Sequence, residues 1–335
     1  MKVIFSSSLP FSLAHGGVQT GIEAMMRHLP GLGVEVEPER WEDTGQTGDV
    51  LHYFGRPFSV LPVRLAHGKG RRVVMTEYLD ETASRSRFRL SAQWLLTRVV
   101  RRALPGLTAR MAWEVYRELD AMIYTTELEW RTARHLFDAH PGRGHIIPHG
   151  LEAAALESLR SPAASEDHLV SVATIHPRKN SVRLARAARE AGVPVVFLGK
   201  PYSEEGAYYA EFRSLVDDKC VIHPGFVSEE EKHRWLRESR GFVLGSEFES
   251  GCVAVYEAAA AGLPLLLANR PWARAGYPSG AELTWVEPRA ERKLAAALRA
   301  FHKRSRRGGQ MTFPVSSWSE IAARYRSVYE TALSG

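Results

Sequence analysis

Cysteine is almost absent from this sequence, and its scarcity excludes several kinds of protein. The 335 residues contain two cysteines, Cys220 and Cys252. Two are too few for a disulfide framework or a cysteine-rich zinc site, so a reducing cytoplasm is compatible with the chain. The sequence also lacks a run of about 18 apolar residues, so we expect no segment to cross a bilayer.

A strong excess of one charge is absent as well. The chain has 44 lysines and arginines against 38 acidic residues, a formal net charge of +6. This mild basicity permits anionic substrates or membrane surfaces, but it is too weak to indicate nucleic acid as a partner. The 44% hydrophobic and 24% charged residues exclude a wholly disordered chain, and the length predicts about two domains.

Short apolar runs alternate with helical patterns, and this alternation restarts once. Strands are predicted at residues 2–6, 34–36, 49–54, 72–76, 121–125 and 145–148, and again at 168–174, 193–198, 219–223, 241–244, 263–268 and 283–286. Helical patterns lie at 18–32, 87–117, 127–137, 181–192, 228–238, 252–261, 289–302 and 317–333. Residues 152–167 are predicted to be a boundary, with a weakly structured Ser-Pro-Ala-Ala-Ser run at 161–165. Strand–helix alternation indicates parallel sheets covered by helices on both faces. We therefore predict an α/β fold with Rossmann-like domains at 1–152 and 165–316 and a C-terminal helical segment at 317–335.

The strand–loop–helix segment 241–268 carries the most specific motif. Ligands of parallel sheets bind beyond the carboxyl ends of the strands, and Glu249 lies in the loop at such an end. Glu257 lies within the following helix, where its carboxylate can accept hydrogen bonds from a ribose diol. The start of that helix offers backbone N–H groups and the positive end of the helix dipole to an anion. The alternative is that both glutamates are solvated surface residues.

This segment resembles the signature of glycosyltransferase family 4. The signature has two glutamates separated by seven residues, then an alanine-rich helix, a glycine and a proline, as in Glu249, Glu257, residues 258–262 and Pro264. The family's usual Gly-Phe-Gly-Leu-Pro between the glutamates is replaced here by residues 250–254, Ser-Gly-Cys-Val-Ala. The resemblance implies the GT-B fold, in which two Rossmann-like domains face each other across a cleft and the C-terminal helix crosses back to the first domain. It also implies retaining transfer of a glycosyl unit from a nucleotide sugar.

Two further loops resemble the same family. Arg178 and Lys179 follow the strand at 168–174, and two cations there suit a diphosphate, although solvated basic residues are the alternative. Many family members have an arginine where Thr174 stands, so Arg178 is expected to supply that charge, and Lys179 matches the family's lysine. Gly16 and Gly17 follow the first strand and resemble the family's N-terminal glycine loop, with a plain loop as the alternative.

Other family positions have no match in this sequence. Glu77 and Tyr78 stand where many members end a strand in His-Asp. The family histidine that touches the donor sugar therefore cannot be identified, and His52 is either a core residue or a site residue.

Residues 82–113 contain seven arginines and no acidic residue. Drawn as a helix, this stretch places Trp94, Arg98, Arg101 and Arg102 on one face and Leu95, Leu96, Val99 and Val100 on the other. We predict that the apolar face packs on the domain core. The basic face is then either solvated or docked on an anionic lipid surface or glycan acceptor.

These observations together predict a glycosyltransferase of the hexosyltransferase type. It moves a sugar from a UDP- or GDP-sugar to a hydroxyl of a glycan, a lipid-linked acceptor or a small molecule, as in polysaccharide biosynthesis. The predicted catalytic residues are Glu249, Lys179 and Arg178, and the predicted donor-binding residues are Gly16, Gly17, Thr174, Ser250, Gly251, Cys252, Val253 and Glu257. No Asp-x-Asp or paired-histidine spacing indicates a metal site, so we expect neither a metal nor another cofactor. The expected location is the cytoplasm, at the inner face of the membrane if the basic helix docks there.

Two alternatives remain open from the sequence. One is an epimerase-like enzyme on the same fold, which acts on the nucleotide sugar without an acceptor. The other is a non-catalytic protein that binds nucleotide sugars.

Overall fold

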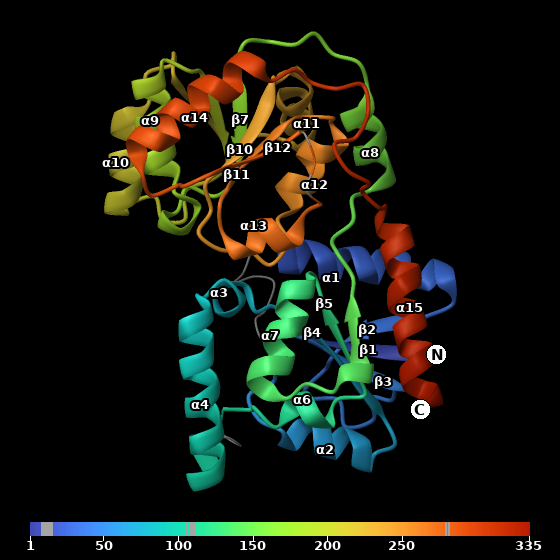
Figure 1. Cartoon of the computed structure of the whole chain (residues 1–335). Helices are drawn as coiled ribbons and strands as arrows, with labels where there is room; N and C mark the ends of the chain where they lie inside the picture. Colours follow the sequence, from blue (N-terminus) through green and yellow to red (C-terminus); the bar gives the residue numbers. More distant parts are fainter. Residues whose placement is uncertain (8–15, 105, 108–110, 279, 281) are drawn as a thin grey trace. The chain divides into compact units, whose positions relative to one another are not determined.

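The computed structural model describes residues 1–7, 16–104, 106–107, 111–278, 280 and 282–335. These residues form two units, one made of Met1–Gly150 with Trp318–Gly335 and the other of Leu151–Ser317. Each unit contains a six-stranded parallel sheet (Figure 1). Each of the twelve strands predicted from the sequence overlaps an observed strand.

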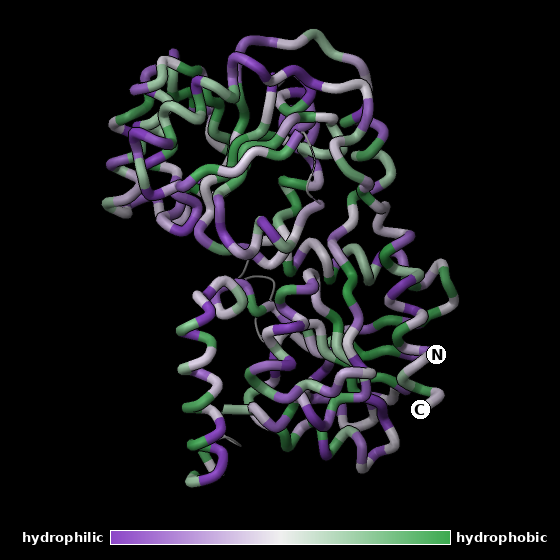
Figure 2. Tube along the Cα trace, in the orientation of Figure 1, coloured by the Kyte–Doolittle hydropathy of each residue, from purple (hydrophilic) through white to green (hydrophobic). Residues whose placement is uncertain are grey.

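The N-terminal sheet has the strand order β2-β1-β3-β4-β5-β6. Its strands are β1 (Lys2–Ser7), β2 (Glu35–Pro38), β3 (Val50–Phe54), β4 (Arg72–Glu77), β5 (Ala121–Tyr124) and β6 (Gly144–Ile146). Its helices are α1 (Gly17–His28), α2 (Leu61–Gly68), α3 (Asp80–Ala83), α4 (Arg87–Ala103), α6 (Val115–Glu118), α7 (Glu127–Phe137) and α15 (Trp318–Ser334), with 3-10 turns at Pro30–Leu32 and Pro141–Arg143. The central strands read as continuous apolar runs because helices cover both faces of a parallel sheet (Figure 2).

The C-terminal helix α15 packs on the N-terminal sheet, as the family resemblance implies. Its side chains share a buried cluster with residues of α1, β1, β3 and β4. The hydroxyl of Tyr329 lies 2.7 Å from Nδ1 of His52, and Nε2 of His52 lies 2.9 Å from the hydroxyl of Thr76. His52 is fully buried, and burial lowers its pKa to about 3. His52 is therefore a neutral core residue that joins α15 to the sheet.

The C-terminal sheet has the strand order β9-β8-β7-β10-β11-β12. Its strands are β7 (Leu169–Val172), β8 (Val195–Leu198), β9 (Val221–Gly225), β10 (Gly241–Leu244), β11 (Leu265–Ala268) and β12 (Leu283–Val286). Its helices are α8 (Ala153–Arg160), α9 (Ser181–Ala191), α10 (Ala207–Leu215), α11 (Glu229–Glu238), α12 (Val253–Ala260), α13 (Pro271–Gly276) and α14 (Glu291–Arg304), with a 3-10 turn at Pro177–Lys179. Ser228 caps α11 in a reciprocal capping box with Glu231.

Two segments differ from the predicted elements. Residues 153–160, part of the predicted boundary, form α8, because Leu156 and Leu159 pack into the core of the C-terminal unit, whereas the run 161–165 contains neither helix nor strand. The helix predicted over 87–117 is shorter: α4 ends at Ala103, and α6 begins at Val115. The intervening residues 105 and 108–110 lie outside the described residues.

The predicted orientation of α4 was also wrong. Leu95, Leu96 and Val99 are more than half exposed, whereas Trp94 packs against the core and stacks on His135. The inward face instead follows positions 90, 94, 97 and 101. Trp94 offers more area for burial than a leucine, and Arg101 on the same face reaches Asp138 at 2.6 Å. No helix within the described ranges is long and apolar enough to cross a membrane.

Candidate functional site

The topology of the C-terminal sheet creates a position where ligands characteristically bind. Strands β7 and β10 are neighbours, but the chain runs outward from β7 to β8 and β9 and, on the other side, from β10 to β11 and β12. The place between two neighbouring strands whose connections run in opposite directions is called a topological switch point. The loops that follow the two strands diverge there, and ligands of doubly wound sheets bind between them. Lys179 follows β7 and Glu249 follows β10, so the topology brings both predicted residues to this point.

Asn180 ties these two loops together. Its backbone is left-handed, with φ of 57°, a conformation that asparagine tolerates better than most residues. The buried side-chain amide donates to the carbonyl of Gly245 at 2.8 Å and to Oε1 of Glu247 at 3.0 Å. The backbone N–H of Glu247 in turn donates to the backbone carbonyl of Arg178 at 2.9 Å. These bonds hold the cation-bearing loop against the carboxylate-bearing loop.

The three predicted catalytic residues form one charged cluster. The ammonium of Lys179 donates to Oε1 of Glu249, and Nη1 of Arg178 lies 3.6 Å from Oε2. The side chains of Lys179 and Glu249 are 11% and 7% exposed, whereas that of Arg178 is 31% exposed and its guanidinium lies 5.4 Å from the ring centroid of Phe248. Two cations face one carboxylate here, so the cluster has a net positive charge that suits an anionic ligand.

The start of α12 follows directly in the chain. Gly251 has a φ of 90°, which a glycine adopts without strain. Cys252 was predicted to bind the nucleotide-sugar donor. Its backbone N–H instead donates a hydrogen bond to the hydroxyl of Tyr277 at 3.0 Å. Burial raises the pKa of the Cys252 thiol to about 11, and the thiol is therefore neutral at physiological pH. Ser250 and Val253 flank these residues and are partly buried.

Glu257 is buried inside the unit, so the alternative that it is a solvated surface residue was wrong. It is 5% exposed on α12, and the ammonium of Lys232 on α11 lies 2.7 Å from its Oε1. Lys232 also lies 2.8 Å from Glu229. Burial acts to lower the pKa of Lys232, but Glu257 and Glu229 together raise it, so the lysine is charged. Lys232 could not be recognised as a site residue from the sequence, because a lysine after three glutamates is typical of a solvated helix surface.

Among the described residues, one group of side chains could hold a metal ion: Glu229, His233 and Glu257. One potential ligand atom of each lies within 4.8 Å of the others. This group has no local sequence pattern, because Glu229 and His233 are four residues apart on α11, whereas Glu257 lies on α12. The ammonium of Lys232 already contacts both glutamates. A metal ion there would have to displace that lysine.

Glu247 is a second residue that sequence reasoning missed. Burial acts to raise its pKa, but hydrogen bonds from Arg289, Asn180 and Arg270 lower the pKa to about 2. The bonds from Arg270 and Arg289 measure 2.9–3.0 Å. Glu247 is thus charged at neutral pH and joins the loops after β7 and β10 to the loop after β11.

The remaining predicted donor-binding residues lie at the ends of β7 and β1. Thr174 is exposed in the loop after β7. Gly16 precedes α1, where its carbonyl accepts from the amide of Thr20 at 3.1 Å, and Gly17 is the first residue of that helix. Both glycines belong to the N-terminal unit, after β1 and next to the switch point between β1 and β3. The other residues between β1 and Gly16, residues 8–15, lie outside the described residues.

Glu77 stands where the family pattern has a histidine or aspartate, and it is an internal residue. It is 5% exposed, and it accepts hydrogen bonds from the hydroxyl of Tyr116 and from the amide of Tyr78 at 3.0 Å. Burial raises the pKa of Glu77.

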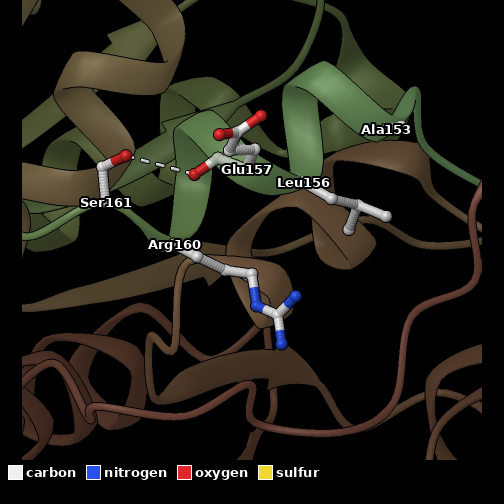
Figure 3. A pocket seen from close by; sticks show the side chains of 5 residues that line it. All are labelled: Ala153, Leu156, Glu157, Arg160 and Ser161. Atoms are coloured by element: carbon white, nitrogen blue, oxygen red, sulfur yellow. Dashed lines mark hydrogen bonds between the residues drawn. The ribbon is translucent and has the colours of Figure 1, made fainter.

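Figure 3 shows a surface pocket beside α8 that is separate from this constellation. It is lined by Ala153, Leu156, Glu157, Arg160 and Ser161, and the hydroxyl of Ser161 donates to the carbonyl of Glu157 at 3.1 Å. Neither a predicted catalytic residue nor a predicted donor-binding residue lines it. The cluster of Glu249, Lys179 and Arg178 therefore remains the candidate site.

Comparison with solved structures defines the class of fold. Sucrose-phosphate synthase from Thermosynechococcus elongatus superposes with a TM-score of 0.70 at 16% identity, over 100% of both chains. HepE from Anabaena, in complex with UDP and glucose, superposes with a TM-score of 0.63 at 14% identity, over 100% of this chain and 98% of the other. WaaG, a glycosyltransferase involved in lipopolysaccharide biosynthesis, gives a TM-score of 0.57 at 17% identity over 99% and 98%. The chain has the α/β architecture of GT-B proteins, so the predicted fold class is confirmed.

The sequence comparison adds a match between a family model and less than half of the chain. The family model described as "Glycosyl transferases group 1" matches residues 160–308, which make up most of the C-terminal unit. The resemblance to glycosyltransferases is thereby confirmed for this broad group, and membership of family 4 stays a prediction. No curated protein matches the sequence.

Proposed function

We propose that this protein is a retaining, metal-independent glycosyltransferase of the hexosyltransferase type that uses a nucleotide-sugar donor. The observation that carries the proposal is the cluster of Glu249, Lys179 and Arg178 at the switch point of the C-terminal sheet. The same unit matches the glycosyl transferases group 1, and the structural neighbour HepE has been solved with UDP and glucose. UDP- and GDP-sugars are therefore the donor classes to test.

In this proposal the two cations bind the donor diphosphate. Lys179 and Arg178 are paired with Glu249 when no anion is bound, and a diphosphate competes with that carboxylate for them. Preorganised charges of this kind stabilise the negative charge that develops on a leaving phosphate. The positive end of α12 adds to the same field.

The carboxylates take the hydroxyl groups of the donor. Glu257, held by Lys232, accepts from the ribose diol, and Glu249 accepts from hydroxyls of the sugar once the diphosphate has drawn the cations away. The bond between the anomeric carbon and the phosphate oxygen breaks, and a bond from that carbon to the acceptor oxygen forms on the same face. The acceptor's proton passes to the leaving phosphate, so no metal ion or side-chain nucleophile enters the scheme.

The acceptor is a hydroxyl of a glycan, a lipid-linked molecule or a small molecule, and the reaction takes place in the cytoplasm. A peripheral contact with an anionic membrane belongs to the same proposal, because it would bring the enzyme to a lipid-linked acceptor.

The first test is thermal denaturation against UDP, GDP and a panel of their sugars. A ligand at 100 times its Kd stabilises the protein by about 2.7 kcal/mol, which a melting curve resolves. The second test follows release of the nucleoside diphosphate with and without acceptor, in buffer with and without EDTA. Acceptor-dependent release unaffected by EDTA supports the proposal, and no stabilisation by any nucleotide sugar would reject it.

The same assays separate the two alternatives left open by the sequence. Conversion of the donor sugar without an acceptor indicates an epimerase-like enzyme. Stabilisation without turnover, in the presence of a broad acceptor panel, indicates a non-catalytic binding protein.

A further inference from the structure

Helix α4 exposes an apolar face that the described residues of its unit leave uncovered. Phe88, Leu95, Leu96 and Val99 are 82%, 58%, 60% and 54% exposed. At about 100° per residue, Phe88, Leu95 and Val99 fall within about 40° of one another on the helix surface. Figure 2 shows hydrophobic and hydrophilic residues alternating along this helix. We call Phe88, Leu95, Leu96 and Val99 the outer apolar face.

Arginine side chains border the outer apolar face. Arg87, Arg89 and Arg102 are exposed, and within the described part of the chain no acidic group pairs with their guanidinium groups. Arg98 is 56% exposed, lies 3.8 Å from Asp138 and stacks over Trp94 at 4.4 Å. The 17 residues of α4 contain no Asp or Glu. The face thus combines exposed apolar side chains with uncompensated positive charge.

We propose that the outer apolar face of α4 inserts into the interface of an anionic lipid surface, with the bordering arginines on the headgroups. Helices that lie in a membrane interface combine these features, since their apolar face enters the acyl boundary and their basic residues bind anionic lipid. Arginine can extend its charged end to the headgroups while its stem covers apolar surface. Charge complementarity favours this occupant over a second copy of the chain, because a symmetric dimer on this face would bring the same arginines together.

This inference sharpens the membrane contact within the proposed function and changes the residues that make it. The sequence analysis assigned the contact to Arg98, Arg101 and Arg102. Arg101 is directed inward instead: its side chain is 16% exposed and paired with Asp138 at 2.6 Å. Arg87 and Arg89 replace it, and the apolar residues, predicted to be buried in the core, become part of the contact.

The test is co-sedimentation of the full-length protein with vesicles of equal parts phosphatidylglycerol and phosphatidylcholine. Replacing Arg87, Arg89 and Arg102 by Gln should weaken binding about 100-fold at low salt, since each basic residue near an anionic surface contributes about fivefold. Replacing Phe88, Leu95 and Val99 by Gln should weaken it at least about 30-fold, because full burial of one such side chain strengthens association more than tenfold. The apolar variant keeps every charge. Any loss of vesicle affinity in this variant therefore reports the insertion of apolar side chains and not electrostatic attraction.

A matched control lies on α2 of the same unit. Leu61 and Leu65 are also exposed, at 58% and 59%, and replacing both by Gln should leave vesicle binding within about twofold of the original protein. Equal loss in this control, or unchanged binding of the apolar α4 variant, would overturn the assignment. Absence of vesicle binding together with a dimer that the α4 variant dissociates would assign the face to a second copy instead.

Vesicle binding and donor binding are measured on the same variants. All α4 variants should keep the melting temperature and UDP affinity of the original protein, because their substitutions are on the surface. Failure of vesicle binding with intact UDP binding would reject the membrane inference alone. Failure of both UDP and GDP to bind the original protein would reject the proposed function without touching the vesicle result.

Discussion

Replacing Lys232 by Met removes the partner that holds the carboxylate of Glu257. The two side chains are 15% and 7% exposed and 2.7 Å apart. Methionine keeps the length and apolar stem of lysine but carries no charge, so the substitution removes the ion pair with little change in volume. The buried carboxylate then has no positive charge of Lys232 beside it.

The expected cost to stability follows from this burial. Removing one partner of a buried ion pair costs about 3–5 kcal/mol, since an uncompensated charge remains in the interior. Lys232 keeps some access to solvent, so we expect a loss of about 2–3 kcal/mol in the free energy of unfolding. Replacing Glu257 by Gln as well removes the unpaired charge, and the double variant should regain most of that loss.

The expected effect on the donor follows from the same ion pair. Without Lys232, the Glu257 carboxylate loses the cation that holds it in place, so it is less well positioned to accept hydrogen bonds from ribose hydroxyls. A hydrogen bond to a charged group contributes about 1.5–3 kcal/mol, so UDP should bind the Lys232→Met variant at least about tenfold more weakly. The ratio of the variant's Kd to that of the original protein measures this loss.

Urea denaturation and isothermal titration calorimetry with UDP measure the two effects. Lys219→Met is the matched control, since Lys219 is an exposed lysine of the same unit and should change neither quantity. A loss of stability below about 0.5 kcal/mol, with a Kd ratio near one, would refute the role assigned to Lys232. A stability loss without any change in the Kd ratio would show that Glu257 does not bind the ribose.

Three further predictions address the cluster, a glycine and the core. Lys179→Ala should lower kcat by about 10²–10³, the scale for removing one preorganised charge, whereas Lys219→Ala should leave it unchanged; a near-normal Lys179→Ala enzyme would contradict the diphosphate role. Gly199→Ala should cost more than about 2 kcal/mol in urea denaturation, because φ is 147° and the added Cβ would lie 2.3 Å from the carbonyl oxygen of Ala173; a melting temperature like that of the original protein would contradict this. His52 has a folded pKa of about 3 against 6.5 when unfolded, so the unfolded state binds more protons between these values and stability should fall as pH falls below about 6.5. From pH 6.5 to 5 this residue alone should contribute roughly 2 kcal/mol of that loss, and a His52→Phe variant with the same pH slope would refute the assignment.

The strands of both sheets could be predicted from the sequence because the strands of a parallel sheet are buried on two faces. They then read as continuous apolar runs between helical patterns, as in the segment 241–268. The positions of Glu249 and Lys179 followed from the same rule, since residues after such strands gather at one edge of the sheet. Local pattern was sufficient wherever the deciding contacts lie within one element, as in the capping box of α11.

Only the tertiary structure decided which face of α4 is buried and which partners hold the site. In α4 both faces contain apolar residues, and packing of Trp94 against the core and of Arg101 against Asp138 selects the inward one. Lys232 contacts Glu257, which lies 25 residues further along the chain. The three residues before Lys232 are glutamates, so the local sequence is typical of a solvated helix surface. Such a pair forms only when two helices pack side by side. Their relative position is set by tertiary packing and cannot be predicted from the periodicity of either helix.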